Sequence, residues 1–300
     1  MYYFFSPYFY SVLISLRNSL QMSQTAPHNL SKVKHIVMVL SGKGGVGKST
    51  VACQLALTLA LRHHKKVGLL DVDICGPSVP RICGLGNCDV YKGPTGWRPV
   101  SFKEHHKLDG EGDVKVMSIA YLLPSENDAV VWRGPKKDAI IKQFINEVEW
   151  GELDFLIVDT PPGTSDEHLT LCETLKGPHL AGAVIVTTPQ SVSTDDVRKE
   201  LSLCYKLEVR CLGIVENMSG FVCPHCEECT DIFHSGGGEK LAQQYEVPFL
   251  GNIPIDPTLS LCEDNGEAFC GKEGGKTDKC LVAIIENIVQ QVERAKEVVA

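Results

Sequence analysis

The stretch that decides the fold reads Ser41-Gly-Lys-Gly-Gly-Val-Gly-Lys-Ser-Thr50. It follows the apolar run Ile36-Val-Met-Val-Leu40 and precedes residues 51–60, which are helix-like in composition. A strand, a glycine-rich loop and a helix in this order form an anion-binding site, because the loop amides and the helix N-terminus point at the ligand. We therefore expect a phosphate group to bind here.

Two phosphate-binding patterns fit this loop. The glycines of the dinucleotide pattern G-x-G-x-x-G are Gly42, Gly44 and Gly47. Residues 42–49 also fit G-x-x-x-x-G-K-[ST], which is more specific, because Lys48 brings a cation to the β- and γ-phosphates and Ser49 offers a hydroxyl to Mg²⁺. The sequence therefore predicts a nucleoside triphosphate as the ligand. It also contains Lys43, a lysine that the general pattern does not require and that an anion is expected to neutralise.

Composition limits the classes of protein that fit. The chain has 300 residues, of which 43% are hydrophobic, and this is ample for a buried core. Its formal net charge is -8 and it has no long lysine or arginine cluster, so nucleic-acid binding is not expected. The 13 cysteines are odd in number and spread along the chain, which predicts a reducing compartment and no disulfide framework. Four of them in apolar or helical stretches are expected to be small buried side chains: Cys53, Cys172, Cys204 and Cys211.

Residues 1–33 are expected to lie outside the fold, and residues 34–300 to form one domain. The segment 2–16 is mostly apolar, but Pro7 interrupts it and it is too short to span a bilayer. Basic residues do not precede it as they do in a signal peptide. We predict no membrane association and interpret residues 1–21 as a dispensable extension or the product of an upstream start.

Carboxylates follow two of the predicted buried strands. Asp71 and Asp73 come after residues 66–70, and Asp159 comes after residues 153–158. Ligands of open α/β sheets bind outside the carboxyl ends of the strands, so these acids are expected beside the phosphates. At that position a P-loop protein holds Mg²⁺, and the sequence therefore predicts a magnesium site.

The order of apolar runs predicts the fold class. Further strands are expected at residues 114–120, 183–188 and 211–215, and further helices at 192–207 and 281–292. Strands that alternate with helices indicate an α/β protein, a P-loop NTPase with a mostly parallel sheet and helices on both faces. Asn217, just beyond one predicted strand, is placed to hydrogen-bond the edge of a base.

A cysteine run, Cys223-Pro-His-Cys226-Glu-Glu-Cys229, lies in a predicted loop at residues 223–229. A thiol–disulfide site is disfavoured, because such a pair normally begins a helix in a thioredoxin-type domain. A structural zinc site would use the three cysteines and His234. Alternatively, two cysteines are half of a Cys₄ shell, and a two-fold dimer would place a second pair opposite them around an iron–sulfur cluster.

Together these motifs resemble the Mrp/Nbp group of deviant-Walker ATPases over residues 34–270. The segments that carry the resemblance are Gly42-Lys-Gly-Gly-Val-Gly-Lys-Ser49, Asp71-Val-Asp73, Cys75-Gly-Pro-Ser78, Trp132-Arg-Gly-Pro135, Asp159-Thr-Pro-Pro-Gly-Thr-Ser-Asp166 and Asn217-Met-Ser-Gly-Phe-Val-Cys-Pro-His-Cys226. The chain is similar to the shorter eukaryotic cytosolic members, because longer members carry an N-terminal ferredoxin-like set of four cysteines and here no cysteine precedes Cys53.

The resemblance implies a weak ATPase that assembles a labile [4Fe-4S] cluster across a dimer interface on Cys223 and Cys226, with Cys229 undecided as a ligand. It implies a hetero-oligomer, such as a heterotetramer, with the longer subunit, and a homodimer as a second assembly. The cluster would pass through cluster-targeting factors to cytosolic and nuclear apo-proteins, and the chain would be cytoplasmic, with a nuclear pool as a further expectation.

The resemblance also implies the roles of the nucleotide-site residues. Lys43 would reach a phosphate across the dimer, Asp73 would orient the attacking water, and Asn217 would contact adenine. Ser49, Asp71 and Asp159 would support Mg²⁺. The residues expected to bind ATP are Gly42, Lys43, Gly44, Gly45, Val46, Gly47, Lys48, Ser49, Thr50 and Asn217, and those expected to be catalytic are Lys43, Lys48 and Asp73.

Two other functions compete with this interpretation. A partitioning or positioning ATPase with a structural zinc site would share the loop, but it would need a basic amphipathic tail or a basic patch, and the sequence contains neither. A dehydrogenase would use Asp71 on a ribose hydroxyl, but this leaves Asp73 and Lys48 without a role. The ATPase scaffold accounts for more of the residues.

Overall fold

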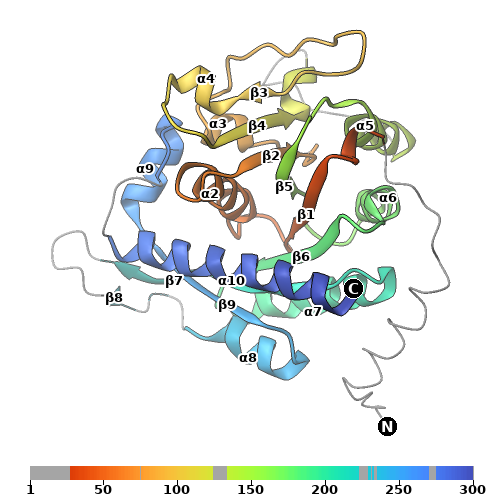
Figure 1. Cartoon of the computed structure of the whole chain (residues 1–300). Helices are drawn as coiled ribbons and strands as arrows, with labels where there is room; N and C mark the ends of the chain where they lie inside the picture. Colours follow the sequence, from red (N-terminus) through yellow and green to blue (C-terminus); the bar gives the residue numbers. More distant parts are fainter. Residues whose placement is uncertain are drawn as a thin grey trace.

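The computed structural model describes residues 28–74, 76–123, 134–222, 229–230, 232, 235–269 and 275–299. Its strands are β1 (Val33–Leu40), β2 (Lys66–Asp71), β3 (Val100–Ser101), β4 (Asp113–Ser118), β5 (Leu153–Asp159), β6 (Leu180–Thr187), β7 (Cys211–Val222), β8 (Cys229–Thr230) and β9 (Phe249–Ile255). They form one sheet in the order β3-β4-β2-β5-β1-β6-β7-β8, with β9 also paired to β7 (Figure 1). Every pairing between these strands is parallel except those of β3 with β4 and of β8 with β7.

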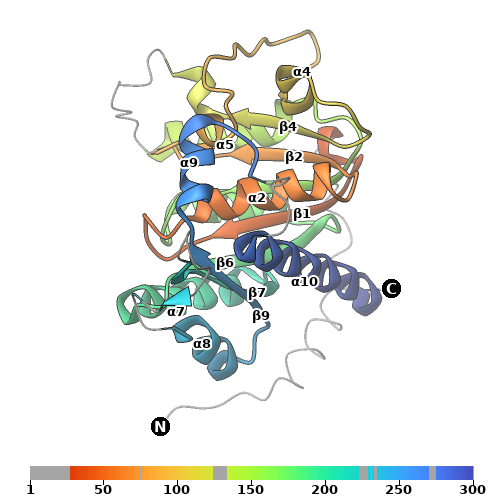
Figure 2. The same ribbon diagram turned by 90° about the vertical axis from the view of Figure 1, so that its left-hand side faces the viewer.

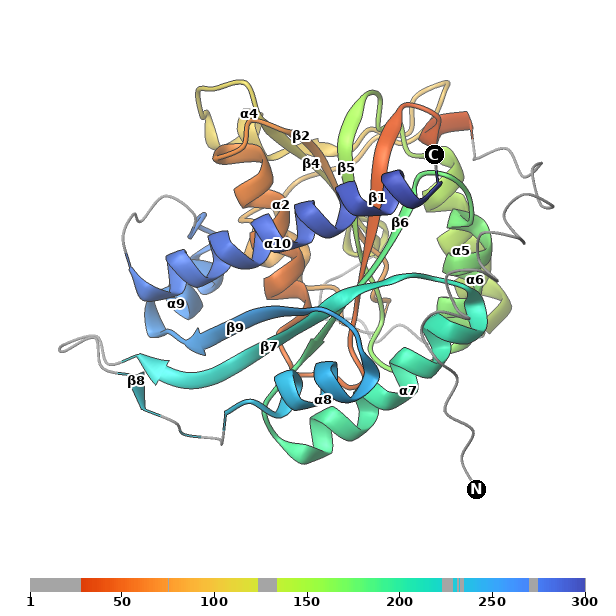
Figure 3. The ribbon, with the colours of Figure 1, turned by 60° about the horizontal axis from the view of Figure 1, so that its bottom comes forward.

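Helices cover both faces of the sheet. They are α2 (Lys48–Leu61), α3 (Val79–Ile82), α4 (Phe102–His106), α5 (Gly134–Glu147), α6 (Asp166–Leu175), α7 (Ser191–Leu207), α8 (Gly237–Tyr245), α9 (Pro257–Asn265) and α10 (Lys276–Val299), with 3₁₀ turns η1 (His28–Leu30) and η2 (Ile119–Leu122). One core cluster holds the buried residues of α2, α9 and α10, and the other holds those of α5, α6, α7 and α8. Figures 2 and 3 show α2 and α10 on one side of the sheet and α7 and α8 on the other. This arrangement confirms the predicted fold class.

The central strands are apolar because both of their faces are buried. Residues 36–40 of β1 and 155–159 of β5 are all buried, as is typical of parallel strands between two helix layers. Helix α10 has one buried side, with Leu281, Ile284, Ile285, Ile288 and Val292, so the predicted core-packing helix is confirmed. An ion pair of 2.5 Å between Arg62 and Asp278 fixes its first turn to the end of α2.

Two predicted boundaries are wrong. Leu30 and Val33 are 1% exposed and join the core, so residues 28–33 belong to the fold although the predicted domain starts at residue 34. Strand β7 continues seven residues past the predicted end at residue 215, because polar residues pair with β9 there. In the part of the chain that the structure describes, no helix has the length and apolar character needed to cross a membrane.

Candidate functional site

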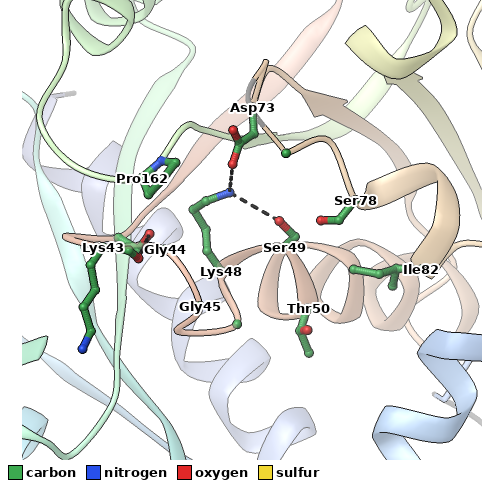
Figure 4. A pocket seen from close by; sticks show the side chains of 13 residues that line it. Lys43, Gly44, Gly45, Lys48, Ser49, Thr50, Asp73, Ser78, Ile82 and Pro162 are labelled. Atoms are coloured by element: carbon green, nitrogen blue, oxygen red, sulfur yellow. Dashed lines mark hydrogen bonds and ion pairs between the residues drawn. The ribbon is translucent and has the colours of Figure 1, made fainter. Parts of the chain in front are cut away.

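The loop between β1 and α2 lies in a pocket at the carboxyl ends of the parallel strands. Residues Lys43 to Thr50 line one side of this pocket, except Val46 (Figure 4). Ser41 of the same loop also lines the pocket, and the residues that line it from other segments are Asp73, Gly76, Ser78, Ile82 and Pro162. The structure therefore brings together the glycine loop and the acidic strand ends that the sequence predicts to share a site.

Lys48 is the charged centre of the pocket. Its amino group lies 2.7 Å from Asp159 Oδ1 and 3.7 Å from Asp73 Oδ2. Ser49 Oγ donates a hydrogen bond of 2.6 Å to Asp159 Oδ2, so one carboxylate holds both the lysine and the hydroxyl. Burial alone lowers the pKa of Lys48, but the charges of Asp159, Asp73 and Asp71 outweigh burial and raise this pKa. Lys48 is thus charged, and a phosphate can take the place of its carboxylate partner.

Asp71 has neutral donors at both of its oxygens. Oδ1 accepts from the Asp73 amide at 3.1 Å, and Oδ2 accepts from Ser118 Oγ at 2.9 Å and from the Val79 amide at 3.4 Å. Burial, with a contribution from the nearby Asp159 charge, raises the pKa of the Asp71 carboxyl to about 8. These contacts hold the ends of the segment from Asp73 to Val79. The predicted support of Mg²⁺ by Asp71 stays a prediction.

Asp73 keeps one oxygen without a partner. Its Oδ1 is buried and accepts no hydrogen bond from any residue that the structure describes, while its Oδ2 faces Lys48. A buried carboxylate oxygen without a donor is costly, and a water or a metal ion would satisfy it. The position is compatible with the predicted role in orienting water, and that role stays a prediction.

Two glycines of the loop are needed for steric reasons. Gly47 has a φ of 82°, which side chains rarely adopt, and a Cβ there would lie 2.1 Å from Asn217 Nδ2. A Cβ on Gly42 would lie 2.6 Å from Asp196 Cβ in α7. The loop is thus packed closely against both β7 and α7.

Asn217 lies within β7 and not beyond a strand end, as the sequence suggested. Its side chain is buried and donates from Nδ2 to the Val46 carbonyl at 2.9 Å. In this structure the asparagine therefore holds the glycine loop. Its predicted contact with adenine stays a prediction.

Lys43 and Thr50 point away from the cluster around Lys48. Figure 4 shows the Lys43 side chain extending away from Lys48. Thr50 Oγ1 donates to Glu263 Oε2 in α9 at 2.9 Å, and the other oxygen of Glu263 is buried with no partner among the described residues. No local pattern in the sequence points to Glu263, since 213 positions separate it from Thr50.

The turn after β5 is tied to the glycine loop. The Gly163 amide donates to the Ser41 carbonyl at 2.7 Å, and Thr160 Oγ1 donates to the Val39 carbonyl at 2.9 Å. Pro162, between them, lines the pocket. A group at the γ-phosphate position would therefore meet this turn directly.

This geometry is that of a P-loop NTPase, and comparison with known proteins agrees. A family model described as ParA, the NUBPL iron-transfer P-loop NTPase, matches residues 32–292. The chain belongs to this family. The family assignment accounts for the nucleotide-binding loop and the mostly parallel sheet, and it indicates nucleotide hydrolysis in general terms.

Individual relatives of this NUBPL-type NTPase share more than half of their aligned residues with this chain. The cytosolic Fe-S cluster assembly factor CFD1 of Kluyveromyces lactis is 59% identical over 233 residues, which are 78% of this chain and 81% of the relative. The cytosolic Fe-S cluster assembly factor NUBP2 of Homo sapiens is 54% identical over 265 residues, which are 88% of this chain and 95% of the relative. The resemblance to cytosolic iron–sulfur assembly proteins is thus confirmed.

Solved structures share the fold. A nucleotide-binding protein from Archaeoglobus fulgidus, in complex with ADP, has a TM-score of 0.68 and 40% identity and covers 80% of this chain and 89% of its own. The MinD cell division protein of Aquifex aeolicus has a TM-score of 0.59 at 21% identity, and the match covers 85% of this chain and 97% of the MinD chain. The second likeness is one of fold alone.

The predicted cluster ligands Cys223 and Cys226 lie outside the described residues of this NTPase, as do His234, Cys75 and Arg133. Of Cys229 the structure describes the backbone, in β8. Within the described ranges, no three side chains of His, Cys, Asp or Glu are arranged to hold a metal ion. The four cysteines expected in the core are buried, except that Cys211 is only partly so.

Proposed function

We propose that this NTPase is an ATP-dependent scaffold that assembles a labile [4Fe-4S] cluster and transfers it to apo-proteins of the cytosol and nucleus. The observation that carries the proposal is the match to the CFD1 and NUBP2 cytosolic Fe-S cluster assembly factors along most of both chains. The pocket around Lys48 supplies the nucleotide half of this activity, and the cysteine run at residues 223–229 supplies the cluster half.

The nucleotide half uses residues that already lie together. Lys48 would leave Asp159 for the β- and γ-phosphates, and Ser49 would turn its hydroxyl oxygen to Mg²⁺. Asp159 would then hold a water of the metal, while the free oxygen of Asp73 would orient the attacking water. Asp71 would act through its hold on the segment 73–79. Bound Mg²⁺ would supply the charge that polarises the transferring phosphoryl group.

Lys43 would act on a second copy of the chain. Its side chain extends away from Lys48 of the same chain. Lys48 is the lysine that the general pattern assigns to the phosphates of its own nucleotide, so Lys43 does not share that role. In a face-to-face dimer it would contact the nucleotide of the facing subunit, and the weak ATPase activity would depend on assembly. Nucleotide and cluster would then report on the same interface.

The cluster half requires a second chain as well. Cys223 and Cys226 supply two thiolates, and a facing pair completes the four ligands of a [4Fe-4S] cluster. The facing pair would come from a longer subunit of this family with an N-terminal ferredoxin-like cysteine set, or from a second copy. A cluster held at such an interface is exposed, which suits transfer.

Anaerobic reconstitution with iron and sulfide tests this proposal. Wild type should gain the visible absorbance of an iron–sulfur cluster, with about two iron atoms per chain if two chains share one [4Fe-4S] cluster. Cys223→Ala/Cys226→Ala should gain neither, whereas the control Cys280→Ala should load as wild type does. Equal loading of wild type and double variant would refute the assignment, and one tightly held zinc per chain would favour the structural alternative.

A further inference from the structure

Two adjacent residues of strand β7 contact different parts of the molecule: Asn217 contacts the glycine loop, and Glu216 contacts the start of α8. Glu216 and Asn217 are adjacent in this strand, and successive side chains of a strand point to opposite faces of the sheet. Their neighbours follow the same alternation, since Ile214 belongs to the core on the α8 side and Val215 to the core on the α2 side. Glu216 and Asn217 thus form a polar link through the sheet.

On the α2 side, Asn217 fits closely against the glycine loop. Its Nδ2 donates to the Val46 carbonyl at 2.9 Å, and the absence of a side chain on Gly47 leaves room for the amide. Val46 and Gly47 precede Lys48 directly, so any adjustment of the loop around phosphate displaces the partner of Asn217.

On the other side, Glu216 holds the start of α8. It is 1% exposed, and its Oε2 accepts from the Gly238 amide at 2.6 Å. Its Oε1 accepts from the Gly236 amide at 3.0 Å and from Ser219 Oγ at 2.7 Å. Amides at a helix N-terminus lack partners within the helix, so a carboxylate from the strand satisfies them and favours the helix dipole. The same carboxylate therefore joins the end of β7 to the beginning of α8.

The end of β7 and the beginning of α8, which Glu216 joins, flank the cysteine run in the sequence. The run begins one residue after β7 ends at Val222, and α8 begins at Gly237. Between Glu216 and Val222 the strand is irregular, because its register with β9 shifts after Asn217 and Met218 has a φ of 58°. A non-glycine residue with a left-handed backbone conformation is strained, and it keeps this conformation only where the surrounding structure imposes it.

We propose that the Glu216–Asn217 pair transmits nucleotide occupancy from the glycine loop to the N-terminus of α8, and so to both ends of the cysteine run. The link has one acceptor at the loop, two amide donors at the start of α8 and one hydroxyl donor, Ser219, within β7, all in the described part of the chain. Its consequence for an iron–sulfur cluster rests on the proposed function. The coupling between nucleotide and α8 does not depend on that function.

A role limited to capping α8 would explain the contacts of Glu216 but would not involve Asn217 or the nucleotide. The two roles differ in what happens when nucleotide binds. A cap keeps the Gly236 and Gly238 amides equally protected with and without nucleotide, whereas a transmitting link changes their protection.

Hydrogen exchange of the full-length protein, followed by mass spectrometry of peptides that cover residues 235–245, separates these roles. A saturating non-hydrolysable ATP analogue with Mg²⁺ should change exchange of the first turn of α8 at least about threefold in wild type. In Glu216→Gln the analogue should still bind with an affinity within about twofold of wild type, while exchange at α8 no longer responds.

The matched control is Glu200→Gln, which changes another buried glutamate that forms a hydrogen bond with neither Glu216 nor Asn217 and should respond as wild type does. Ser219→Ala removes one donor to Glu216 and serves as a second variant if Glu216→Gln fails to fold. In Ser219→Ala the nucleotide-dependent change in hydrogen exchange at α8 should fall to about half of the wild-type change. Unchanged exchange in wild type, or a full response in a folded Glu216→Gln, would overturn the proposal. A protein that responds at α8 but loads no cluster would refute the proposed function and leave this link standing.

Discussion

The carboxyl ends of β2 and β5 look alike but are built differently. Asp71 and Asp159 are paired in register on neighbouring strands, and both are fully buried. Asp71 receives hydrogen bonds from two amides and a serine hydroxyl, whereas Asp159 faces the ammonium group of Lys48 and the hydroxyl of Ser49.

From this difference we expect the two acids to have different roles. The partners of Asp71 are fixed parts of the fold, so the carboxylate determines the shape of a neighbouring segment. The partners of Asp159 are the two groups that we expect a nucleotide and its metal ion to engage, so we expect the contacts of Asp159 to change when ligand binds. Two aspartates at paired positions of neighbouring strands are thus expected to differ in role because their hydrogen-bond donors differ: one stabilises the fold, and the other responds to ligand binding.

The largest effect is expected from removing the cation at the β5 end. Lys48→Ala should weaken ATP binding by on the order of 100-fold, because the phosphates lose their fixed charge and Asp159 is left unpaired. Isothermal titration calorimetry would measure this change.

Lys43→Ala is the matched control in the same loop. It should leave ATP affinity within about twofold of wild type and lower hydrolysis about tenfold or more, because a lysine that acts across a dimer contributes to the transition state and little to binding. Equal loss of affinity in both variants would contradict the distinction between the two lysines.

The next test makes one substitution at both strand ends. Asp159→Asn should lower hydrolysis by on the order of 100-fold, because the metal loses its carboxylate support. Asp71→Asn should keep ATP affinity and lose about 1–3 kcal/mol of unfolding free energy, because an amide cannot accept all three donors. Steady-state ATPase assays and urea denaturation of both variants give the comparison, and a catalytic loss confined to Asp71→Asn would reverse the assignment.

Two serines sharpen the comparison with smaller changes. Ser49→Ala should reduce the contribution of Mg²⁺ to ATP affinity about tenfold, and it should also cost about 1 kcal/mol of unfolding free energy because the buried Asp159 loses a donor. Ser118→Ala should cost about 1 kcal/mol of unfolding free energy and leave Mg²⁺-dependent binding as it was. Titrations with and without Mg²⁺, paired with thermal unfolding, measure both quantities. The same magnesium dependence in both variants would be inconsistent with this account.

Glu200 in α7 extends the comparison to a carboxyl group with no donor, and the smallest functional effect is expected there. Both of its oxygens are buried without a hydrogen-bond partner in the described structure, and burial, then Asp196, raises its pKa from 4.5 to about 8. A raised folded-state pKa means that stability is highest below pH 4.5 and falls as the pH rises through about 8.

Glu200→Gln should remove this dependence. The free energy of unfolding of the variant relative to wild type should increase between pH 5 and pH 9, by on the order of 1–3 kcal/mol. Nucleotide binding should not change. Chemical denaturation at several pH values gives the curve, and parallel curves for the two proteins would show that the carboxyl group is not buried unpaired.

The elements that depend on local pattern can be predicted from the sequence. Strands β1, β2 and β5 lie at the predicted apolar runs, and the glycine loop and the acids follow them as predicted. These features depend on the pattern of neighbouring residues, which the sequence shows directly. The continuation of β7 past Asn217 was missed, since a polar segment with a register shift does not look like a strand.

Side-chain roles that depend on distant partners could not be predicted. The donors to Asp71 are one example: Ser118 and the Val79 amide reach its oxygen from separate segments, while its predicted support of Mg²⁺ stays a prediction. Glu263 and Glu216 belong to no local motif, and only the folded chain brings them to Thr50 and to the start of α8. Such contacts are set by topology and not by spacing.

Control of the iron–sulfur cluster by the nucleotide state can be tested by measuring cluster transfer from the reconstituted protein to an apo-[4Fe-4S] acceptor, with and without ATP. Wild type should transfer the cluster at a rate that ATP changes at least about fivefold, and Lys48→Ala should transfer at one rate under both conditions. A wild-type transfer rate that is the same with and without saturating ATP would contradict the account.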